Sequence, residues 1–346
     1  MAKSILVVSP AWLGDIIMSQ SLLKTLKRQD PDCQITMYAP AYAHVIIERM
    51  KEVDSIITNP FAHGSLDLAG RYSEGKKLKA MGFDKVYVLP NSLKSALVPF
   101  FAGIKERIGL KGESRYLLLN KMIKDKTSYQ RMSARYVALA YIDDKNVVDD
   151  KSLPAFDYPS LEVKKPSDEL LERLNLSLDR PLLVLGCGAN YGPAKLWPAE
   201  YFAKVSAHFI GKGYCVVAPG SQKDKPTTEL IAKHLKEINE TYLDNYKDVI
   251  GASSAAVCND SGLMHTVAAA NVPQVCIFGS TSTGYTPPLS EIAACVESTQ
   301  PCHPCFKRTC KFDTYACLKE LTPDMVITKL EEVIAKSNTI ACKSTS

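Results

Sequence analysis

Short apolar runs alternate with longer amphipathic stretches along most of the chain. Between residues 4 and 141 the apolar runs have the length of strands, and each is followed by a segment with helical periodicity. Strands that are buried on both faces are continuous apolar runs, and their alternation with helices favours parallel pairing. This half therefore predicts a doubly wound parallel sheet. The expected strands are 4–9, 34–39, 55–58, 85–89 and 107–110, and the expected helices are 16–29, 42–50, 66–81, 92–101 and 128–141.

The alternation stops at about residue 143 and resumes near residue 182. Residues 143–166 contain three prolines and clustered charges, which predict a linker. We therefore expect an α/β protein with two Rossmann-like domains, residues 1–160 and 161–346, facing a central cleft at the carboxyl ends of their strands. In the second domain the expected strands are 182–187, 215–218, 255–258, 275–278 and 293–297, and the expected helices are 198–210, 223–236, 243–252, 262–270 and 323–335.

Composition sets the class of the protein and its compartment. The 346 residues are 46% hydrophobic and 23% charged, which is typical of a globular protein. No apolar run approaches membrane-spanning length and the first residues lack a signal-peptide pattern, so we expect a cytoplasmic protein. In that compartment the eleven cysteines are expected to be reduced thiols or metal ligands.

The formal charge of +5 is unevenly distributed along the chain. Residues 1–165 contain 25 Lys and Arg against 18 Asp and Glu, whereas the remainder contains 17 against 19. Between Lys105 and Arg135 there are nine basic residues and three acidic ones. A solvated surface is the ordinary explanation, but the bias also fits an acidic sugar, an anionic membrane surface or nucleic acid as a partner. No nucleic-acid-binding motif accompanies the charge, which disfavours nucleic acid.

The segment CNDSGLMH, residues 258–265, lies between an apolar run of strand length and an Ala-rich helical segment. Its Asn, Asp and Ser favour a helix cap, and Gly262 lets the backbone approach a ligand closely. Such a turn presents N–H groups to an anion, so this stretch alone supports a phosphate site and an ordinary capped helix equally. His265 would look towards the same anion, although a lone helix histidine is more often a packed side chain.

Three further loops at predicted strand ends carry candidate chemistry. Residues 186–198 combine three glycines with Lys195, which suits a diphosphate, and the alternative is a surface loop with a solvated lysine. The spacing is not that of a P-loop, which disfavours an ATPase. Residues 218–224 are small and polar and suit a nucleotide. Asp15 begins a helix, and local evidence favours a cap, although a general base would have to lie in such a loop.

Cys302, Cys305, Cys310 and Cys317 form a separate cluster in the sequence. A Cys-x-x-Cys pair can hold zinc, but the later spacings fit no known zinc finger, so reduced structural thiols are favoured over a metal site. A redox-sensitive loop is a third interpretation.

Taken together, these loops resemble those of the ADP-heptose–lipopolysaccharide heptosyltransferases, which are family 9 glycosyltransferases with the GT-B fold. The matching blocks span nearly the whole chain in the family's order, and the NSxKSAL block is the most specific. They are residues 10–20 (PAWLGDIIMSQ), 88–103 (VLPNSLKSALVPFFAG), 192–198 (GPAKLWP), 259–265 (NDSGLMH), 286–290 (TPPLS) and 302–308 (CHPCFKR).

The resemblance implies an inverting transfer of L-glycero-D-manno-heptose from ADP-heptose to the first heptose of the lipopolysaccharide inner core on Kdo2-lipid A. The N-terminal domain would bind this acceptor and the C-terminal domain the nucleotide sugar, and no cofactor would be required. Asp15 would be the general base, against the local preference for a cap, and Lys195 would stabilise the departing ADP. The donor-binding residues would be Gly188, Lys195, Ser221, Asp260, Ser261, Gly262 and His265, and the acceptor-binding residues Asn91, Lys94, Ser95, Arg107 and Arg115.

Some features depart from the family pattern or leave alternatives open. Cys187 and Asn190 replace a proline and an acidic residue, and residues 237–243 are short, which predicts a missing or displaced strand beside the adenine pocket. The basic first half predicts peripheral contact with the anionic inner face of the inner membrane. The alternatives in function are a family 9 transferase acting at another sugar, such as heptosyltransferase I or III, and a nucleotide-sugar-binding protein without turnover.

Overall fold

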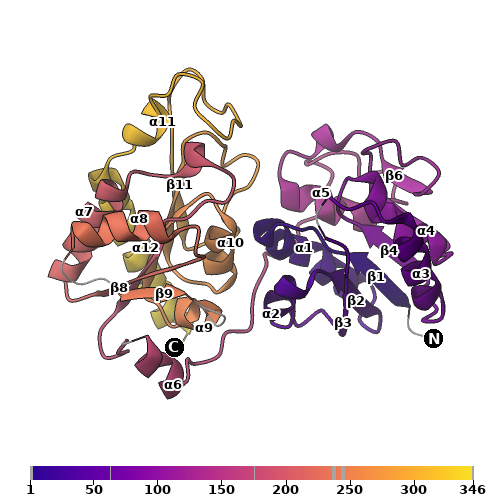
Figure 1. Cartoon of the computed structure of the whole chain (residues 1–346), viewed down its shortest axis with the longest axis horizontal. Helices are drawn as coiled ribbons and strands as arrows, with labels where there is room; N and C mark the ends of the chain where they lie inside the picture. The colour runs from indigo at the N-terminus through magenta and orange to yellow at the C-terminus, as the bar shows by residue number, and fades with distance from the viewer. Residues whose placement is uncertain (1–2, 63, 175, 236–238, 243–245, 345–346) are drawn as a thin grey trace. The chain divides into compact units, whose positions relative to one another are not determined.

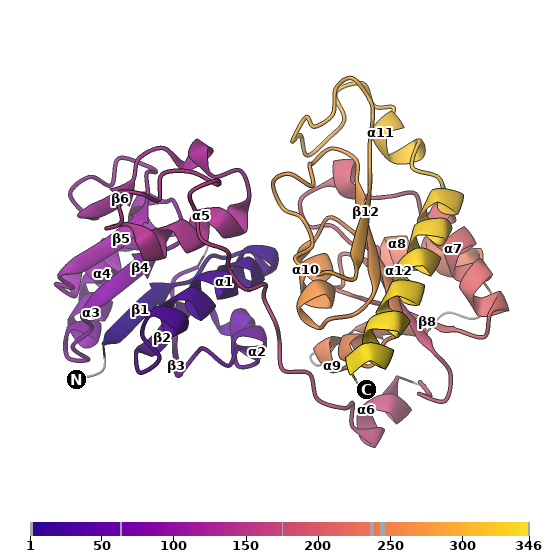
Figure 2. The ribbon, with the colours of Figure 1, turned by 180° about the vertical axis from the view of Figure 1, so that it is seen from behind.

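The structure of the chain is a computed structural model that describes residues 3–62, 64–174, 176–235, 239–242 and 246–344. The chain forms two compact units, Met1–Leu161 and Glu162–Ser346. Each unit is built on one six-stranded sheet in which the neighbouring strands pair in parallel. Helices cover both faces of each sheet, so the α/β doubly wound arrangement that the sequence predicts is confirmed (Figures 1 and 2).

The first unit has the strand order β3-β2-β1-β4-β5-β6. Side chains of its central strands, such as Leu6 and Val86, are buried beneath Leu78 of α3 and Val98 of α4. Its strands are β1 (Ser4–Val8), β2 (Gln34–Ala39), β3 (Ser55–Thr58), β4 (Lys85–Val88), β5 (Glu106–Leu110) and β6 (Lys121–Ile123). Its α-helices are α1 (Leu13–Gln29), α2 (His44–Ile47), α3 (Leu68–Lys79), α4 (Leu97–Phe101) and α5 (Met132–Ala138), and short 3-10 turns cover Ala41–Ala43, Leu93–Ala96, Lys126–Ser128 and Leu139–Tyr141.

The second unit has the strand order β12-β11-β10-β7-β8-β9. Its strands are β7 (Leu182–Gly186), β8 (Cys215–Gly220), β9 (Asn239–Tyr242), β10 (Ala255–Asn259), β11 (Gln274–Phe278) and β12 (Ala293–Glu297). Its helices are α6 (Asp168–Arg173), α7 (Ala199–Gly211), α8 (Lys225–Lys233), α9 (Tyr246–Gly251), α10 (Gly262–Ala269), α11 (Ala316–Lys319) and α12 (Pro323–Ser344), with a 3-10 turn at Pro193–Lys195.

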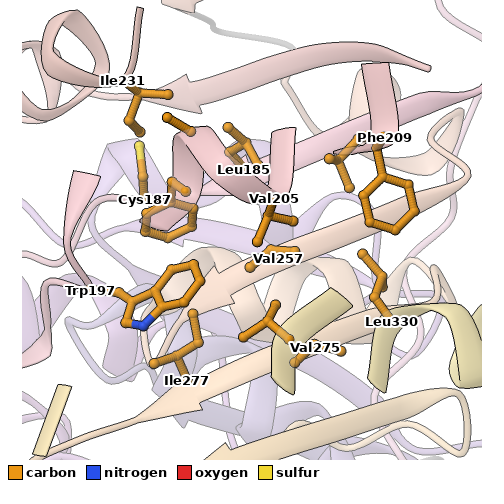
Figure 3. Close-up of a cluster of buried hydrophobic side chains, with 14 of the residues drawn as sticks. Leu185, Cys187, Trp197, Val205, Phe209, Ile231, Val257, Val275, Ile277 and Leu330 are labelled. Carbon is orange, nitrogen blue, oxygen red and sulfur yellow. The ribbon is translucent and has the colours of Figure 1, made fainter. Parts of the chain in front are cut away.

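The central strands β7, β10 and β11 of the second sheet are mainly apolar because both faces are covered. Leu183 and Leu185 of β7 belong to a core shared with α7, α8 and α12, whereas Leu182 and Val184 belong to a second core shared with α6, α9 and α10. Figure 3 shows the first core, in which Trp197 packs among the strand side chains. Because Trp197 stands two residues after Lys195, this core extends from the sheet to the loop that carries Lys195.

Several elements differ from the expectations. The strand β9 is present and pairs in parallel with β8, so the prediction of a missing or displaced strand is wrong; residues 236–238 and 243–245 of that segment lie outside the described residues. The strand β6 and the helices α6 and α11 were not expected, because they are short and lack an apolar period. The last helix continues to Ser344 rather than ending near residue 335. Within the described residues, none of the helices combines the length and apolar character that a bilayer crossing needs.

Candidate active site

The candidate residues of the second unit lie in loops that follow neighbouring strands. β8, β7, β10 and β11 are consecutive in the sheet, and all of them run in the same direction. Their carboxyl ends therefore lie at one edge, where parallel α/β sheets bind ligands. Gly188 follows β7, Ser221 follows β8, Asp260 follows β10 and Thr281 follows β11.

Lys195 and Asp260 form a close ion pair at this edge. Lys195 Nζ lies 2.6 Å from Asp260 Oδ2, and the side chains are 15% and 4% exposed. Thr281 Oγ1 donates a hydrogen bond of 2.6 Å to the same carboxylate oxygen. The lysine predicted from the glycine-rich loop is therefore neither solvated nor distant from the Asn-Asp-Ser-Gly turn, because Asp260 holds it there.

Asn259, the last residue of β10, fixes the segment that carries Lys195. Its side chain is buried, Nδ2 donates to Cys187 O at 2.7 Å, and Oδ1 accepts from Trp197 N at 3.2 Å. One amide thus joins the ends of two strands to the Lys195 segment. The sequence pattern indicated Asn259 only as a possible helix-cap residue next to Asp260.

The amino end of α10 has polar groups that make no hydrogen bond within the described residues. Ser261 stands at the cap position, but its side chain makes no capping hydrogen bond, and Ser261 Oγ and Ser280 Oγ are both buried without a partner there. The first residue of the helix, Gly262, adds a main-chain N–H to this end. The Ser261 hydroxyl therefore does not cap α10, in contrast to the alternative interpretation of this turn as an ordinary capped helix.

His265 lies one turn into α10 and is buried. Burial lowers the pKa of its imidazole to about 4, although the Asp260 carboxylate acts in the opposite direction. The imidazole is therefore uncharged at neutral pH. It can share a hydrogen bond, but it adds no positive charge to the site.

Gly188 and Ser221 are brought together by Asp224. The Asp224 carboxylate accepts hydrogen bonds from Ser221 N at 2.7 Å and from Ser221 Oγ at 2.8 Å. A side chain at Gly188 would place its Cβ 2.2 Å from Asp224 Oδ1, so the Asp224 carboxylate would have to move away from its present position. Asp224 is a second organising residue that the sequence analysis did not single out.

The segment that contains the four clustered cysteines supports the Lys195 loop from outside. Ala194 N donates to Arg308 O at 3.0 Å, and Tyr191 Oη donates to Phe306 O at 2.7 Å. Trp197 Nε1 in turn donates to Leu321 O at 2.8 Å. Backbone carbonyls within residues 306–321 therefore hold the Lys195 loop by hydrogen bonds.

The cysteines themselves are free thiols. Backbone N–H groups of Tyr315 and Phe312 lower the pKa of the Cys310 thiol, whereas burial raises that of Cys317. Across the described residues, no group of three or more His, Cys, Asp or Glu side chains is placed to hold a metal ion.

In the first unit, Asp15 lies in the first turn of α1, directly after the loop that follows β1. Tyr136 Oη, from the buried face of α5, donates a hydrogen bond of 3.3 Å to Asp15 Oδ1. The carboxylate thus lies at a strand end and at the positive end of a helix, where its charge is favoured.

The predicted acceptor residues divide into two groups. Asn91, Lys94 and Ser95 lie in the loop after β4, and Arg115 reaches this loop from the segment after β5. Arg107 does not, because its guanidinium donates to Ile104 O at 2.6 Å and to Leu118 O at 2.7 Å. The structure therefore brings four of these five residues together and places Arg107 apart from them.

Comparison with known proteins gives one consistent family. Residues 71–316 match the sequence profile of glycosyltransferase family 9 (heptosyltransferase). Lipooligosaccharide heptosyltransferase 2 of Haemophilus influenzae is 40% identical, covering 96% of this chain and 100% of that protein. Lipopolysaccharide heptosyltransferase 2 of Escherichia coli is 39% identical over 95% of this chain and 98% of that protein. The solved structure of E. coli ADP-heptose lps heptosyltransferase II superposes with a TM-score of 0.84 and 35% identity, covering 97% of this chain and 99% of the other.

Proposed function

The chain belongs to glycosyltransferase family 9, the heptosyltransferases, and on that premise we propose that it acts as heptosyltransferase II. The reaction transfers L-glycero-D-manno-heptose from ADP-heptose to the first heptose of the lipopolysaccharide inner core on Kdo2-lipid A, with inversion. Full-length identity near 40% to proteins named heptosyltransferase 2 supports this sugar position over those of heptosyltransferases I and III. The Lys195–Asp260 pair at the strand ends is the structural observation that carries the proposal.

The second unit is proposed to bind the donor. When the bond between heptose and ADP breaks, negative charge builds up on the leaving diphosphate, and groups aimed at that charge lower the barrier. Lys195 supplies a full positive charge, while the Ser261 hydroxyl and the first N–H groups of α10 supply hydrogen-bond donors. Gly188 and Ser221, organised by Asp224, are proposed to lie along the nucleotide.

The first unit is proposed to bind the acceptor and to activate it. In a single displacement the acceptor hydroxyl attacks the anomeric carbon, and a base removes its proton as the new bond forms. Asp15 is the proposed base, and Tyr136 orients its carboxylate. The basic excess of this unit favours the anionic groups of the inner core and peripheral contact with an anionic membrane surface.

The proposal is tested by incubating the protein with ADP-heptose and mono-heptosylated Kdo2-lipid A. Released ADP and one added heptose in the acceptor mass spectrum are expected. Binding of ADP-heptose without turnover would instead support the non-catalytic alternative. Turnover only on a heptose-free acceptor would identify heptosyltransferase I.

The role of Asp15 is tested by Asp15→Asn. This change keeps the shape of the side chain but removes the base, so we expect kcat to fall about 100-fold to 10,000-fold. Affinity for ADP-heptose, measured by calorimetry, should stay unchanged because the donor is bound by the other unit. A near-normal kcat in the Asn variant would show that another group takes the proton.

A further inference from the structure

We propose that Arg71 and Arg115 are positioning residues that hold the loop of residues 90–95 in the shape that receives the acceptor. This inference rests on the proposed function, and it assigns to Arg71 a role that neither the motifs nor the charge pattern indicated. Both arginines act through the loop and not by contact with substrate.

Arg115 is almost completely buried, with 1% of its surface exposed, and its guanidinium faces the loop. Nη1 donates to Pro90 O at 2.5 Å and lies 3.3 Å from Ser95 Oγ. Nη2 donates to Asn91 Oδ1 at 3.4 Å and to Leu110 O, at the end of β5, at 2.6 Å. One planar group therefore ties both ends of the loop to the neighbouring strand.

Arg71 holds the same loop from α3. Arg71 is 5% exposed, and its Nη1 donates to Lys94 O at 3.0 Å. The remaining nitrogens bind the start of its own helix region, with Nε on Leu66 O at 2.6 Å and Nη2 on Ser65 O at 3.1 Å. Because Lys94 is fixed by its carbonyl, its side chain starts from a defined place and can point its charge at a ligand.

The segment that carries Arg115 adds two more restraints. Leu93 N donates to Glu113 Oε2 at 2.9 Å, and Glu113 N donates to Asn91 O at 3.2 Å. A Cβ at Gly112 would lie 2.3 Å from Asn91 O, so the two segments are in backbone contact. The loop is thus held on two sides before any ligand arrives.

The cost of burying the two guanidiniums favours a positioning role for Arg71 and Arg115 over direct contact with a ligand at the surface. Burying a guanidinium is costly unless its donors are satisfied. Within the described residues these two groups donate to backbone carbonyls and neutral side-chain oxygens, and Arg115 Nε is buried without a partner. Burial lowers the pKa of Arg115 to about 10, so it remains charged at neutral pH. Each guanidinium has one carboxylate acting on it from nearby, Asp67 for Arg71 and Glu113 for Arg115. The two positive charges beneath the loop suit an acceptor that carries carboxylate or phosphate groups.

The test is the pair of variants Arg115→Lys and Arg71→Lys. A lysine keeps the charge but cannot bridge several carbonyls at once. We expect KM for the acceptor to rise about tenfold to a hundredfold, with KM for ADP-heptose changed less than about twofold. Hydrogen–deuterium exchange of the peptide covering residues 90–95 should become faster in both variants.

Two further variants make the test decisive. Arg28→Lys changes an arginine of the same unit that donates to Ala155 O, far from the loop in sequence, and should leave both KM values unchanged. If an arginine variant fails to fold, Glu113→Ala removes an exposed anchor of the same loop and should raise the acceptor KM less strongly.

Folded variants with an unchanged acceptor KM, or with unchanged exchange of residues 90–95, would overturn the inference. If the wild-type protein showed no turnover of ADP-heptose, the proposed function would fail, whereas the exchange experiment would still report whether the arginines hold the loop.

Discussion

The two units place cations beside their candidate loops in opposite ways. In the second unit, the Lys195 ammonium meets one carboxylate, Asp260, at 2.6 Å. In the first unit, the guanidiniums of Arg71 and Arg115 are spread over several carbonyl oxygens. A diphosphate can compete with a single carboxylate for a lysine, but an arginine shared among carbonyls cannot leave without dismantling its loop. We therefore expect the charge of Lys195 to be available to a ligand, whereas the charges of Arg71 and Arg115 hold their own loop in place.

Replacing Lys195 tests the reactive half of this comparison. For Lys195→Met we expect kcat/KM to fall about 100-fold to 1,000-fold, because the leaving diphosphate loses its counter-charge. The variant should also be less stable, since Asp260 is left buried and without its cation. Steady-state kinetics and thermal unfolding measure the two effects.

The double variant Lys195→Met/Asp260→Asn separates these two effects. It removes the unpaired carboxylate, so stability should recover while activity does not. Lys212→Met, at a surface lysine paired with Glu331, is the control and should change neither. Recovery of turnover in the double variant would mean that Lys195 serves only to neutralise Asp260.

Tyr136→Phe tests whether the hydrogen bond from Tyr136 affects the basicity of Asp15, the proposed base of the first unit. The change removes one hydrogen-bond donor from Asp15, which makes the ionised carboxylate less stable. We expect kcat to fall about threefold to tenfold and the acid limb of its pH profile to move to higher pH. Tyr129→Phe removes a hydroxyl that donates to Val147 O nearby in the same unit, and should leave the profile in place. An unshifted acid limb in the Tyr136 variant would contradict the orienting role.

For His265→Gln the effect to be measured is on the pH dependence of stability. Burial lowers the pKa of His265 from its ordinary value of 6.5 to about 4, so between these values the unfolded chain takes up a proton that the folded chain does not. Stability should therefore fall as the pH drops through this window, with His265 contributing about 2 kcal/mol of the loss between pH 7 and pH 5. Urea unfolding at both pH values should show a smaller loss in the Gln variant. The exposed His234→Gln is the control, and an equal pH dependence in both variants would contradict a buried neutral imidazole.

The sequence predicts the sheets far better than the supports of the site. Strands such as Leu182–Gly186 are recognisable because burial on both faces requires a continuous apolar run. Lys121–Ile123 could not be found, because a half-exposed edge strand of three residues has no such run. Lys195 and Asp260 lie in readable motifs. The positioning role of Arg71 and Arg115 could not be predicted in this way. Arginine is normally exposed, and the carbonyls that these two side chains bind are brought together only by the folded backbone.

The Lys195 loop has a consequence for how the protein is made. The loop is supported by residues that come much later in the chain. Tyr191 donates a hydrogen bond to Phe306 O, 115 residues further on, and Trp197 donates one to Leu321 O, 124 residues further on. Contacts between such distant positions form slowly, and during synthesis they must wait for the later residue to be translated. The first unit can fold while the ribosome is still adding the second, but the Lys195 loop lacks these two contacts until residues 306 and 321 have been translated. In newly made molecules the unit proposed to bind the acceptor can therefore form before the loop proposed to bind the donor is supported.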